Sequence, residues 1–283
     1  MPASAVSPSR PASWEARLQL EIRRVGGRSV LARREHRGPL VVQKPFYPEG
    51  EGCVHLVIVH PPGGIAQGDV LDIEVDVEDR AHVLLTTPGA TKWYKCSIGS
   101  SQQRVRFGVA RNATAEWLPQ ENIVFDESRC RLVANVELTK EATFASWEIL
   151  CFGRRAAGER FANGRFEQRI HIRRDGATVW FEGGVVRGND PLLRSPVGLA
   201  NCSVSGTFLI ASEMIGELPL PLLREISPRG AARCGVTRLP EVLVARYLGD
   251  SAEDAKAYFT SLWGVLRPSL CGREANAPRI WTT

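Results

Sequence analysis

The side chains with the clearest capacity for chemistry surround a rigid turn at residues 60–64 (HPPGG). His60 is the best single metal-ligand candidate, because imidazole nitrogen suits nickel, copper and zinc and the prolines after it restrain its position. Asp69 and the hydroxyl pair Thr86-Thr87 follow it in the chain. A carboxylate near hydroxyl groups binds a hydrated divalent ion weakly, and successive weak sites pass an ion along whereas a tight cage retains it. The segment therefore favours a surface or a polar passage over a reaction centre.

Other carboxylates are spread along the chain, and one of them lies in apolar surroundings. Glu148 and Cys151 belong to residues 147–151 (WEILC), where an acid needs a hydrogen-bond partner, water or a cation. His60 and Cys151 are weaker candidates for a transient ion site, because strongly binding ligands would retain the metal. A lone histidine at a strand end is also commonly satisfied by the backbone. The remaining carboxylates with this potential are Asp72, Glu121, Asp126, Glu159 and Glu182.

No catalytic signature accompanies these donors. The histidines occur without HxH, HxxxH or HExxH spacing, and the chain contains no GxSxG motif. The glycine pairs at 63–64 and 183–184 are not followed by Lys-Ser or Lys-Thr, which argues against a phosphate-binding loop. The 7 cysteines are scattered without a CxxC pair. They predict free, mostly buried thiols in a reducing compartment, not a disulfide framework or a structural zinc site.

Alternation of apolar and polar residues must position these side chains. In residues 70–78 the odd positions are apolar and the even ones from Asp72 to Glu78 are acidic, so one face packs inward and the other presents a solvated or docking face. Asp175-Gly176 separates two such runs and predicts a β-hairpin. We therefore expect an all-β fold of many antiparallel strands, in a stacked, β-helix-like or sandwich-like architecture. The other alternating runs cover 53–59, 104–109, 132–138, 166–172 and 177–181.

Two α-helices are expected in the C-terminal third. Ser251 and Asp254 resemble a capping box, and Pro268 is expected to end the helix that they begin. A shorter helix is expected at 219–226. No Pro/Gly-rich linker divides the chain, so we expect a flexible tail over 1–14 and a single domain over 15–283. The apolar face of the longer helix consists of Ala255, Tyr258, Phe259, Leu262 and Leu266.

Composition places the chain among cytoplasmic globular proteins. It has 283 residues, 36 basic against 31 acidic, and a net charge of +5. No run of 18 apolar residues occurs, and the first residues lack the apolar stretch of a signal peptide. Arginines gather at 23–37 and 154–174, yet no nucleic-acid-binding motif accompanies them. A solvated rim or a protein-docking face is the favoured interpretation of these arginines.

Six blocks of sequence resemble the urease accessory protein family UreD, also called UreH. They run in order across nearly the whole chain, and each is several residues long and rich in Trp, Pro or Gly. The blocks are GPLVVQKPFYPEG (38–50), HPPGGIAQGD (60–69), LLTTPGATKWY (84–94), WLPQENIVFD (117–126), GRRAAGERFANG (153–164) and PRIWTT (278–283).

The resemblance implies a non-enzymatic maturation factor with a β-rich stack of strands and two α-helices. Its expected partners are urease apoprotein, UreF and, through UreF, UreG, in a dimer of heterotrimers that supports GTP-dependent nickel insertion. No tightly bound cofactor is expected, because nickel would pass transiently through an internal polar path. The residues expected to supply oxygen ligands along that path are Asp69, Thr86, Thr87, Glu121, Asp126, Glu148 and Glu182.

A protein that grips two partners should present aromatic and arginine side chains at its docking surfaces. The candidates are Trp93, Arg154 and Arg155, with Trp14 and Trp117 as further possibilities. Two other classes of function stay open at this point. A small metalloenzyme or hydrolase would use the same acids, and a nucleic-acid-binding β domain would use the arginine clusters.

Overall fold

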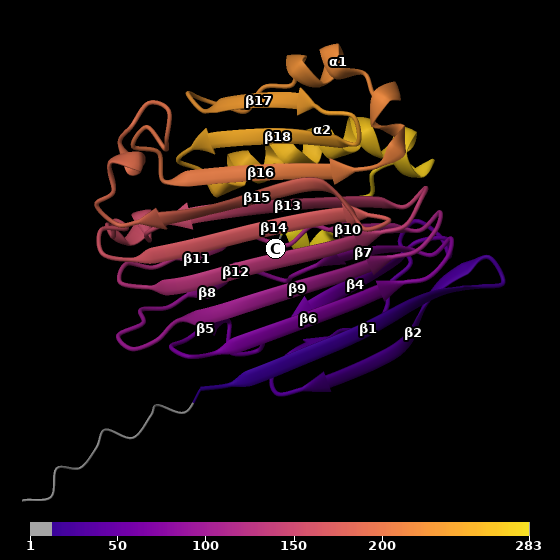
Figure 1. The fold of residues 1–283 in the computed structure, drawn as a ribbon, viewed down its shortest axis with the longest axis horizontal. Helices are drawn as coiled ribbons and strands as arrows, with labels where there is room; N and C mark the ends of the chain where they lie inside the picture. Colours follow the sequence, from indigo (N-terminus) through magenta and orange to yellow (C-terminus); the bar gives the residue numbers. More distant parts are fainter. Residues whose placement is uncertain (1–12, 283) are drawn as a thin grey trace, which may run out of the picture.

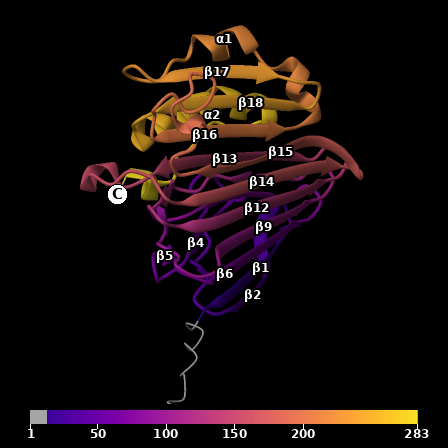
Figure 2. The same ribbon diagram turned by 60° about the vertical axis from the view of Figure 1, so that its left-hand side comes forward.

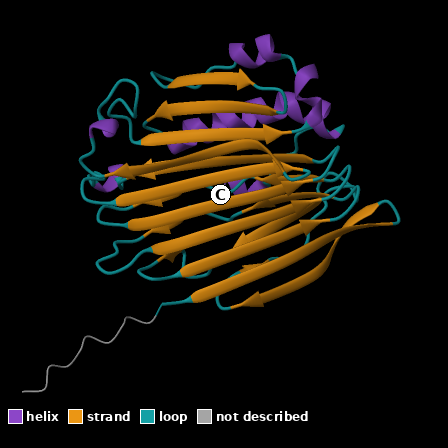
Figure 3. Ribbon diagram, in the orientation of Figure 1, coloured by secondary structure: helices purple, strands orange, loops and turns teal. Residues whose placement is uncertain are grey.

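The computed structural model describes residues 13–282, and strands are its main regular structure, covering nearly half of this part of the chain (Figure 3). The tail expected over 1–14 therefore lies largely outside the described residues. Of that tail, Ser13 and Trp14 are described, and the backbone N–H of Trp14 donates to Asp69 Oδ1 at 2.8 Å. The strands form two sheets that face each other across a core (Figures 1 and 2).

The first sheet has 7 strands in the order β15-β14-β12-β9-β6-β1-β2. Its central strands β6, β9, β12 and β14 pair in parallel, whereas the hairpins β1-β2 and β14-β15 pair antiparallel at its two ends. The bounds are β1 Glu15–Val25, β2 Arg28–Arg37, β6 Val70–Val77, β9 Ser101–Val109, β12 Arg129–Leu138, β14 Arg165–Arg174 and β15 Ala177–Arg187.

The second sheet has 11 strands, with the main order β17-β18-β16-β13-β10-β7-β4-β3. Strands β4, β7, β10 and β13 pair in parallel, and β13-β16-β18-β17 continue antiparallel. Three short strands lie outside this main order: β8 pairs with both β5 and β11, and β11 also pairs with β13. The bounds are β3 Val41–Val42, β4 Val54–Val59, β5 Gly64–Ile65, β7 His82–Thr86, β8 Thr91–Trp93, β10 Thr114–Trp117, β11 Asn122–Val124, β13 Thr143–Phe152, β16 Val204–Ala211, β17 Arg233–Arg238 and β18 Val242–Gly249.

The middle of the chain winds as a β-solenoid. Each coil contributes one strand to the first sheet, one to the second and one short strand beside it, as in β6-β7-β8 and then β9-β10-β11. Successive coils stack in register, so that Ile73 of β6 lies beside Val105 of β9. The expected all-β, stacked, β-helix-like architecture is therefore confirmed.

Strand direction is the part of this prediction that needs correction. Many antiparallel strands were expected, but the stacked coils pair in parallel, and antiparallel pairs are confined to the strands that flank them. The reason is that each coil returns to the same sheet only after crossing the other one, so neighbouring strands run the same way. The predicted Asp175-Gly176 hairpin is confirmed, because it joins the antiparallel strands β14 and β15.

The alternation in β6 places its apolar and acidic residues as expected. Leu71, Ile73, Val75 and Val77 are buried in the core between the sheets. On the outer face, Asp72 pairs with Arg104 at 2.7 Å, and Glu74 pairs with both Arg17 and Arg106. The stacked coils thus carry ladders of opposite charges, which stabilise the in-register pairing.

Both expected helices are present. Helix α1 covers Leu220–Glu225, and helix α2 covers Ala252–Cys271, with its predicted apolar face buried. α2 packs on β13, β16 and β18, at the end of the stack seen at the top of Figure 1. Short 3-10 turns occupy Arg155–Ala157, Pro191–Leu193, Glu213–Glu217 and Arg279–Thr282.

Pro268 does not end α2, contrary to expectation. The helix continues to Cys271, and Gly272, with φ of +62°, caps it by donating to the carbonyl of Pro268. A proline in the last turn removes a single intrahelical hydrogen bond, the one that would reach the carbonyl of Gly264. That loss is too small to stop the helix when its apolar face is packed.

Two further properties bear on function. None of the helices within residues 13–282 is long and apolar enough to cross a lipid bilayer. All 7 cysteines are free; Cys53, Cys96 and Cys130 are buried, and Cys234 is exposed. The prediction of free thiols therefore agrees with the structure, but fewer than half of them are buried, because Cys151, Cys202 and Cys271 are only partly covered.

Candidate functional site

Three cavities follow one another between the two sheets, along the stack of coils. The first has a volume of about 150 Å³, the second about 30 Å³ and the third about 160 Å³. Trp117 lines both the first and the second. Glu148 and Thr207 line both the second and the third. The series begins near β4 and β6 and reaches β15 and β18.

The first cavity is lined by polar groups of the HPPGG turn and the Thr-Thr-Pro-Gly turn. His60 lines it, and His60 Nε2 is buried without a hydrogen-bond partner. Burial lowers the pKa of His60, and the nearby Asp69 carboxylate opposes this only in part. Thr87 also lines this cavity, and its hydroxyl accepts from the Gln120 backbone N–H at 2.9 Å and donates to the Gly89 carbonyl at 3.2 Å. A neutral imidazole and a hydroxyl therefore share this space.

Glu148 stands where the second and third cavities meet. It lies on β13, and its surroundings raise its pKa to about 8, because burial penalises the carboxylate more than one hydrogen bond compensates it. That hydrogen bond comes from Asn122 Nδ2, and Trp93 Nε1 holds the same amide by donating to its Oδ1 at 2.7 Å. Glu148 is therefore mostly protonated at neutral pH, and it lines both cavities.

The third cavity contains a carboxylate, a guanidinium and a hydroxyl. Glu182 Oε1 pairs with Arg246 Nη1 at 2.7 Å, and the same Nη1 donates to Thr207 Oγ1 at 2.6 Å. Glu182 Oε2 is buried without a partner. Gln168 adds an amide to the lining. The cavity therefore offers oxygen donors to a cation, with one arginine as competitor.

The structure brings three of the seven predicted path residues, Thr87, Glu148 and Glu182, to these cavities. Two others hold turns together. Asp69 accepts from the backbone N–H groups of Trp14 and Ala66, and Asp126 accepts from those of Ala162 and Asn163. These hydrogen bonds lower the pKa of Asp126.

The remaining two, Thr86 and Glu121, lie toward helix α2. The Thr86 hydroxyl donates to the Leu118 carbonyl at 2.7 Å and accepts from Trp281 Nε1 at 2.8 Å. Glu121 interacts electrostatically with Lys256, and burial lowers the pKa of that lysine to about 8. Thr86 and Thr87 therefore serve different sides of the second sheet, as expected for consecutive residues at a strand end.

The predicted docking residues differ in accessibility. Trp93 is 0% exposed and belongs to the core, which corrects its assignment to a partner surface. Arg154 is on the surface, 46% exposed and paired with Glu159. Arg155, 54% exposed, pairs with Asp250. Of the two further tryptophans, Trp14 is 49% exposed and Trp117 is buried.

Many of the clustered arginines are already paired with acids. Arg28 pairs with Glu51 at 3.0 Å, and Arg173 pairs with Glu137. Such pairing leaves less unbalanced positive charge than the sequence suggested, which counts against a nucleic-acid-binding face. Further pairs join Arg23 to Glu21 and Glu78, Arg33 to Glu35, Arg165 to Glu167 and Arg174 to Glu241.

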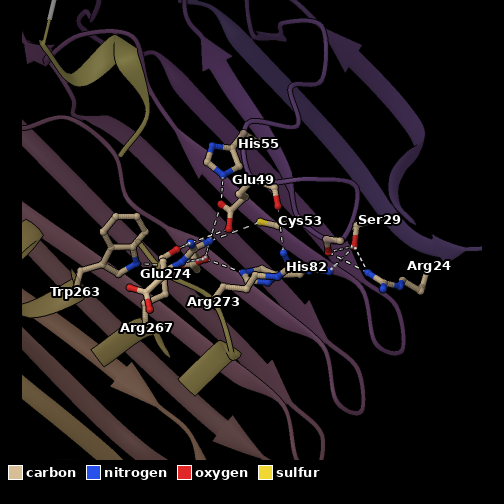
Figure 4. Close-up of polar contacts among 12 residues, drawn as sticks. Arg24, Ser29, Glu49, Cys53, His55, His82, Trp263, Arg267, Arg273 and Glu274 are labelled. Atoms are coloured by element: carbon tan, nitrogen blue, oxygen red, sulfur yellow. Dashed lines mark hydrogen bonds and ion pairs between the residues drawn. The ribbon is translucent and has the colours of Figure 1, made fainter. Parts of the chain in front are cut away.

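Sequence reasoning missed a buried polar cluster between α2 and the second sheet, shown in Figure 4. Arg267 of α2 donates to Glu116 at 3.0 Å and to Glu49 at 2.8 Å. His82 Nε2 lies 2.7 Å from Glu116 Oε1, and His55 Nε2 lies 2.5 Å from Glu49 Oε1. These partners hold the pKa of both glutamates at about 2. The available signal was Glu116, an acid inside the strand sequence TAEW.

Comparison with known families covers nearly the whole described chain. Residues 15–282 match the family described as UreD urease accessory protein. Proteins named urease accessory protein UreD are similar over nearly their full length. That of Dechloromonas aromatica is 48% identical over 279 residues, covering 98% of this chain and 97% of the relative.

Two further relatives extend this similarity. The protein of Methylobacillus flagellatus is 46% identical over 273 residues, covering 95% of each chain. That of Nitrosococcus oceani is 42% identical over 273 residues, covering 96% of this chain and 92% of the relative. The chain therefore belongs to the UreD family of urease accessory proteins.

Proposed function

We propose that this chain is a urease maturation chaperone that binds urease apoprotein and passes nickel through the series of three cavities. In this proposal it acts in the cytoplasm with UreF and, through UreF, with UreG, in a dimer of heterotrimers that supports GTP-dependent nickel insertion. It has no catalytic activity of its own. The observation that carries the proposal is that neighbouring cavities share Trp117, Glu148 and Thr207.

The chemistry of the cavities suits an ion in transit. The first and third cavities offer few donors. The first has an imidazole and a hydroxyl, and the third has carboxyl groups with a hydroxyl and an amide. Glu148, protonated at neutral pH, would bind an ion only by giving up its proton, so it would not retain the ion strongly. Nickel is here the cargo, and each residue acts as a transient oxygen or nitrogen ligand.

Nickel delivery provides the test of the path. Apo-urease is co-expressed with the other accessory proteins and either the original chain or a variant, and urease nickel content and activity are measured. Glu182→Gln and Glu148→Gln should lower both, while the chain still co-purifies with urease. The matched control is Glu137→Gln, which changes an exposed acid of the outer surface and should leave both unchanged.

The outcomes distinguish the chaperone role of the chain from the proposed nickel path through its cavities. Full activation of urease without this chain would overturn the chaperone role. Unchanged nickel content in both cavity variants would overturn the path and leave the docking role standing.

Docking is tested at the exposed arginines. Arg154→Ala and Arg155→Ala should abolish co-purification with UreF or urease while leaving the far-UV circular dichroism unchanged. Because both side chains lie outside the core, their removal should not disturb folding. Co-purification that survives both substitutions would place the docking surface elsewhere on the chain.

A further inference from the structure

We propose that a pocket outside the three cavities binds an acidic segment of a partner protein. This arginine pocket has a volume of about 470 Å³ and lies where loop 153–164 meets loop 188–203. The second loop joins β15 to β16 at the left-hand side of Figure 1. The proposal rests on the docking part of the proposed function and specifies the chemistry of the docked segment. The lining side chains that matter are the exposed Arg155, Arg160 and Arg194 and the more enclosed Phe152, Phe161 and Leu193.

Two of the three guanidinium groups in this pocket have no partner. Within residues 13–282, no hydrogen bond, ion pair or ring contact engages the side chain of Arg160 or Arg194. Arg154, on the same loop as Arg160, is by contrast paired with Glu159. A guanidinium donates two parallel hydrogen bonds to a carboxylate, so the pocket offers two such donors that are not yet used.

Positive charge is in excess at the pocket, because three arginines line it with a single aspartate, Asp190. Asp190 is engaged within its own loop, where its Oδ1 accepts from the Leu192 backbone N–H at 2.9 Å. Arg155 pairs with Asp250 and donates to Ser203 Oγ at 3.2 Å, which fixes its position. An acidic segment therefore meets complementary charge here, whereas a basic segment is repelled.

The two loops that form the pocket are held in place by the fold itself. Asp126 Oδ1 accepts from the backbone N–H groups of Ala162 and Asn163 at 2.8 and 2.7 Å. The Gly188 N–H donates to the Gly164 carbonyl at 2.9 Å, which ties the second loop to the first. A Cβ at position 188 would lie only 2.2 Å from the carbonyl carbon of Ala162, so the loops pack backbone to backbone. Such preorganisation lowers the entropic cost of binding.

The apolar side chains of the pocket favour a polypeptide over a small anion. Phe152 and Phe161 pack against each other with ring centroids 5.4 Å apart, and both line the pocket with Leu193. On loop 188–203, Val197 is 97% exposed. Arginines beside apolar side chains are typical of the centre of a protein–protein interface. A segment with acidic residues around an apolar one satisfies both parts of this surface, whereas a small anion leaves the apolar part uncovered.

Carbodiimide cross-linking tests the chemistry of the docked segment. Arg160→Lys with Arg194→Lys keeps both positive charges and introduces amines that a carbodiimide joins to adjacent carboxylates. The full-length variant is co-expressed with UreF and apo-urease, the complex is cross-linked, and the joined peptides are identified by mass spectrometry. The expected result is an amide bond from position 160 or 194 to an Asp or Glu of UreF or urease.

The matched control lies at the opposite edge of the first sheet from β15. Arg34 and Arg37 of β2 are exposed and, among residues 13–282, are likewise without an ion pair. Arg34→Lys with Arg37→Lys should give no cross-link to UreF or urease.

Charge reversal measures what the pocket contributes to affinity. Arg160→Glu with Arg194→Glu should weaken binding of the cross-linked partner at least about tenfold and make the remaining binding less sensitive to salt. Arg34→Glu with Arg37→Glu should leave both the affinity and its salt dependence unchanged. Because all four side chains are exposed, circular dichroism should match the original chain for both variants.

Two results would overturn the proposal. One is cross-linking from the pocket that does not exceed cross-linking from the control, while the original chain still binds UreF or urease. The other is tight binding of inorganic phosphate that charge reversal abolishes, without a cross-link to a protein carboxylate, which would make the pocket a small-anion site. Failure of the docking role itself would instead appear as an original chain that binds neither protein, so the two failures are distinguishable.

Discussion

Arg267 of helix α2 and Glu116 of strand β10 form an ion pair of 3.0 Å, and their side chains are only 0% and 1% exposed. The pair joins positions that are 151 residues apart in the chain. Glu49 extends it by accepting from the same guanidinium. Because buried charges depend on their partners, this contact fixes α2 against the second sheet.

Removal of the guanidinium should strongly destabilise the fold. Arg267→Met leaves Glu49 and Glu116 buried without their cationic partner, so we expect a loss of about 3–5 kcal/mol in the free energy of unfolding. Chemical denaturation monitored by circular dichroism measures this loss. The control is Arg111→Met, which breaks the exposed pair with Glu141 and should cost at most about 1 kcal/mol. Equal effects of the two substitutions would contradict a special role for the buried pair.

Glu148 should make stability fall as the pH rises. Its pKa rises from the ordinary 4.5 of a glutamic acid to about 8 in the fold, so between these limits the native state holds a proton that the unfolded state has lost. Stability is therefore complete below pH 4.5 and decreases up to pH 8, by at most about 5 kcal/mol. Glu148→Gln, which cannot ionise, should flatten this slope and become the more stable form at pH 8.

Denaturation series at several pH values, with Glu137→Gln beside Glu148→Gln, check this expectation. Glu137 is exposed, so its substitution should keep the original slope. A Glu148→Gln variant with the pH dependence of the original chain would show that Glu148 is ionised in the fold.

The hydrogen bond from Trp281 Nε1 to Thr86 Oγ1 should couple the C-terminal turn to the second sheet. In a double-mutant cycle, Trp281→Phe removes the donor and Thr86→Val removes the acceptor. We expect a coupling energy of about 1 kcal/mol in the free energy of unfolding. The cycle cancels the separate loss of the Thr86 hydrogen bond to the Leu118 carbonyl. Strictly additive effects would mean that this hydrogen bond contributes nothing.

Asp126 should hold the loop at residues 153–164. Asp126→Ala leaves the backbone N–H groups of Ala162 and Asn163 without their acceptor, at a cost of about 1–3 kcal/mol. Limited proteolysis should then cut this loop faster, whereas Asp126→Asn, which keeps one acceptor oxygen, should be cut more slowly than the alanine variant. Because the fold lowers the pKa of Asp126, its contribution is present above the unfolded pKa and is lost as the pH falls.

Sequence patterns predicted the strands well because alternation is a local property. The apolar positions of β6 and the apolar face of α2 are buried as expected. Strand direction depends on where the chain goes after each turn, and a turn signal does not distinguish a hairpin from a coil that returns later. The parallel pairing of the coils was therefore not predicted from their individual strands, although the stacked architecture was.

The candidate site was also predicted only in part, because sequence patterns show which residues are locally unusual but not which of them meet in the fold. Glu148 was identified because an acid in an apolar run is locally conspicuous, and it does line two cavities. Thr86 and Thr87 are adjacent in sequence but point to opposite sides of a strand end, and nothing local indicates which side faces the cavity. Arg267 and Glu116 could not be paired from sequence, because only the completed stack brings them together.

The buried pair also has a consequence for the order of events during synthesis. Glu49 leaves the ribosome 218 residues before its partner Arg267, and Glu116 leaves 151 residues before it. Until Arg267 emerges, these carboxylates stay hydrated on the face of the second sheet that α2 later covers, because burying them without a cationic partner carries a large electrostatic penalty. The core between the two sheets can therefore form first, whereas the burial of this outer face of the second sheet awaits translation of the last helix.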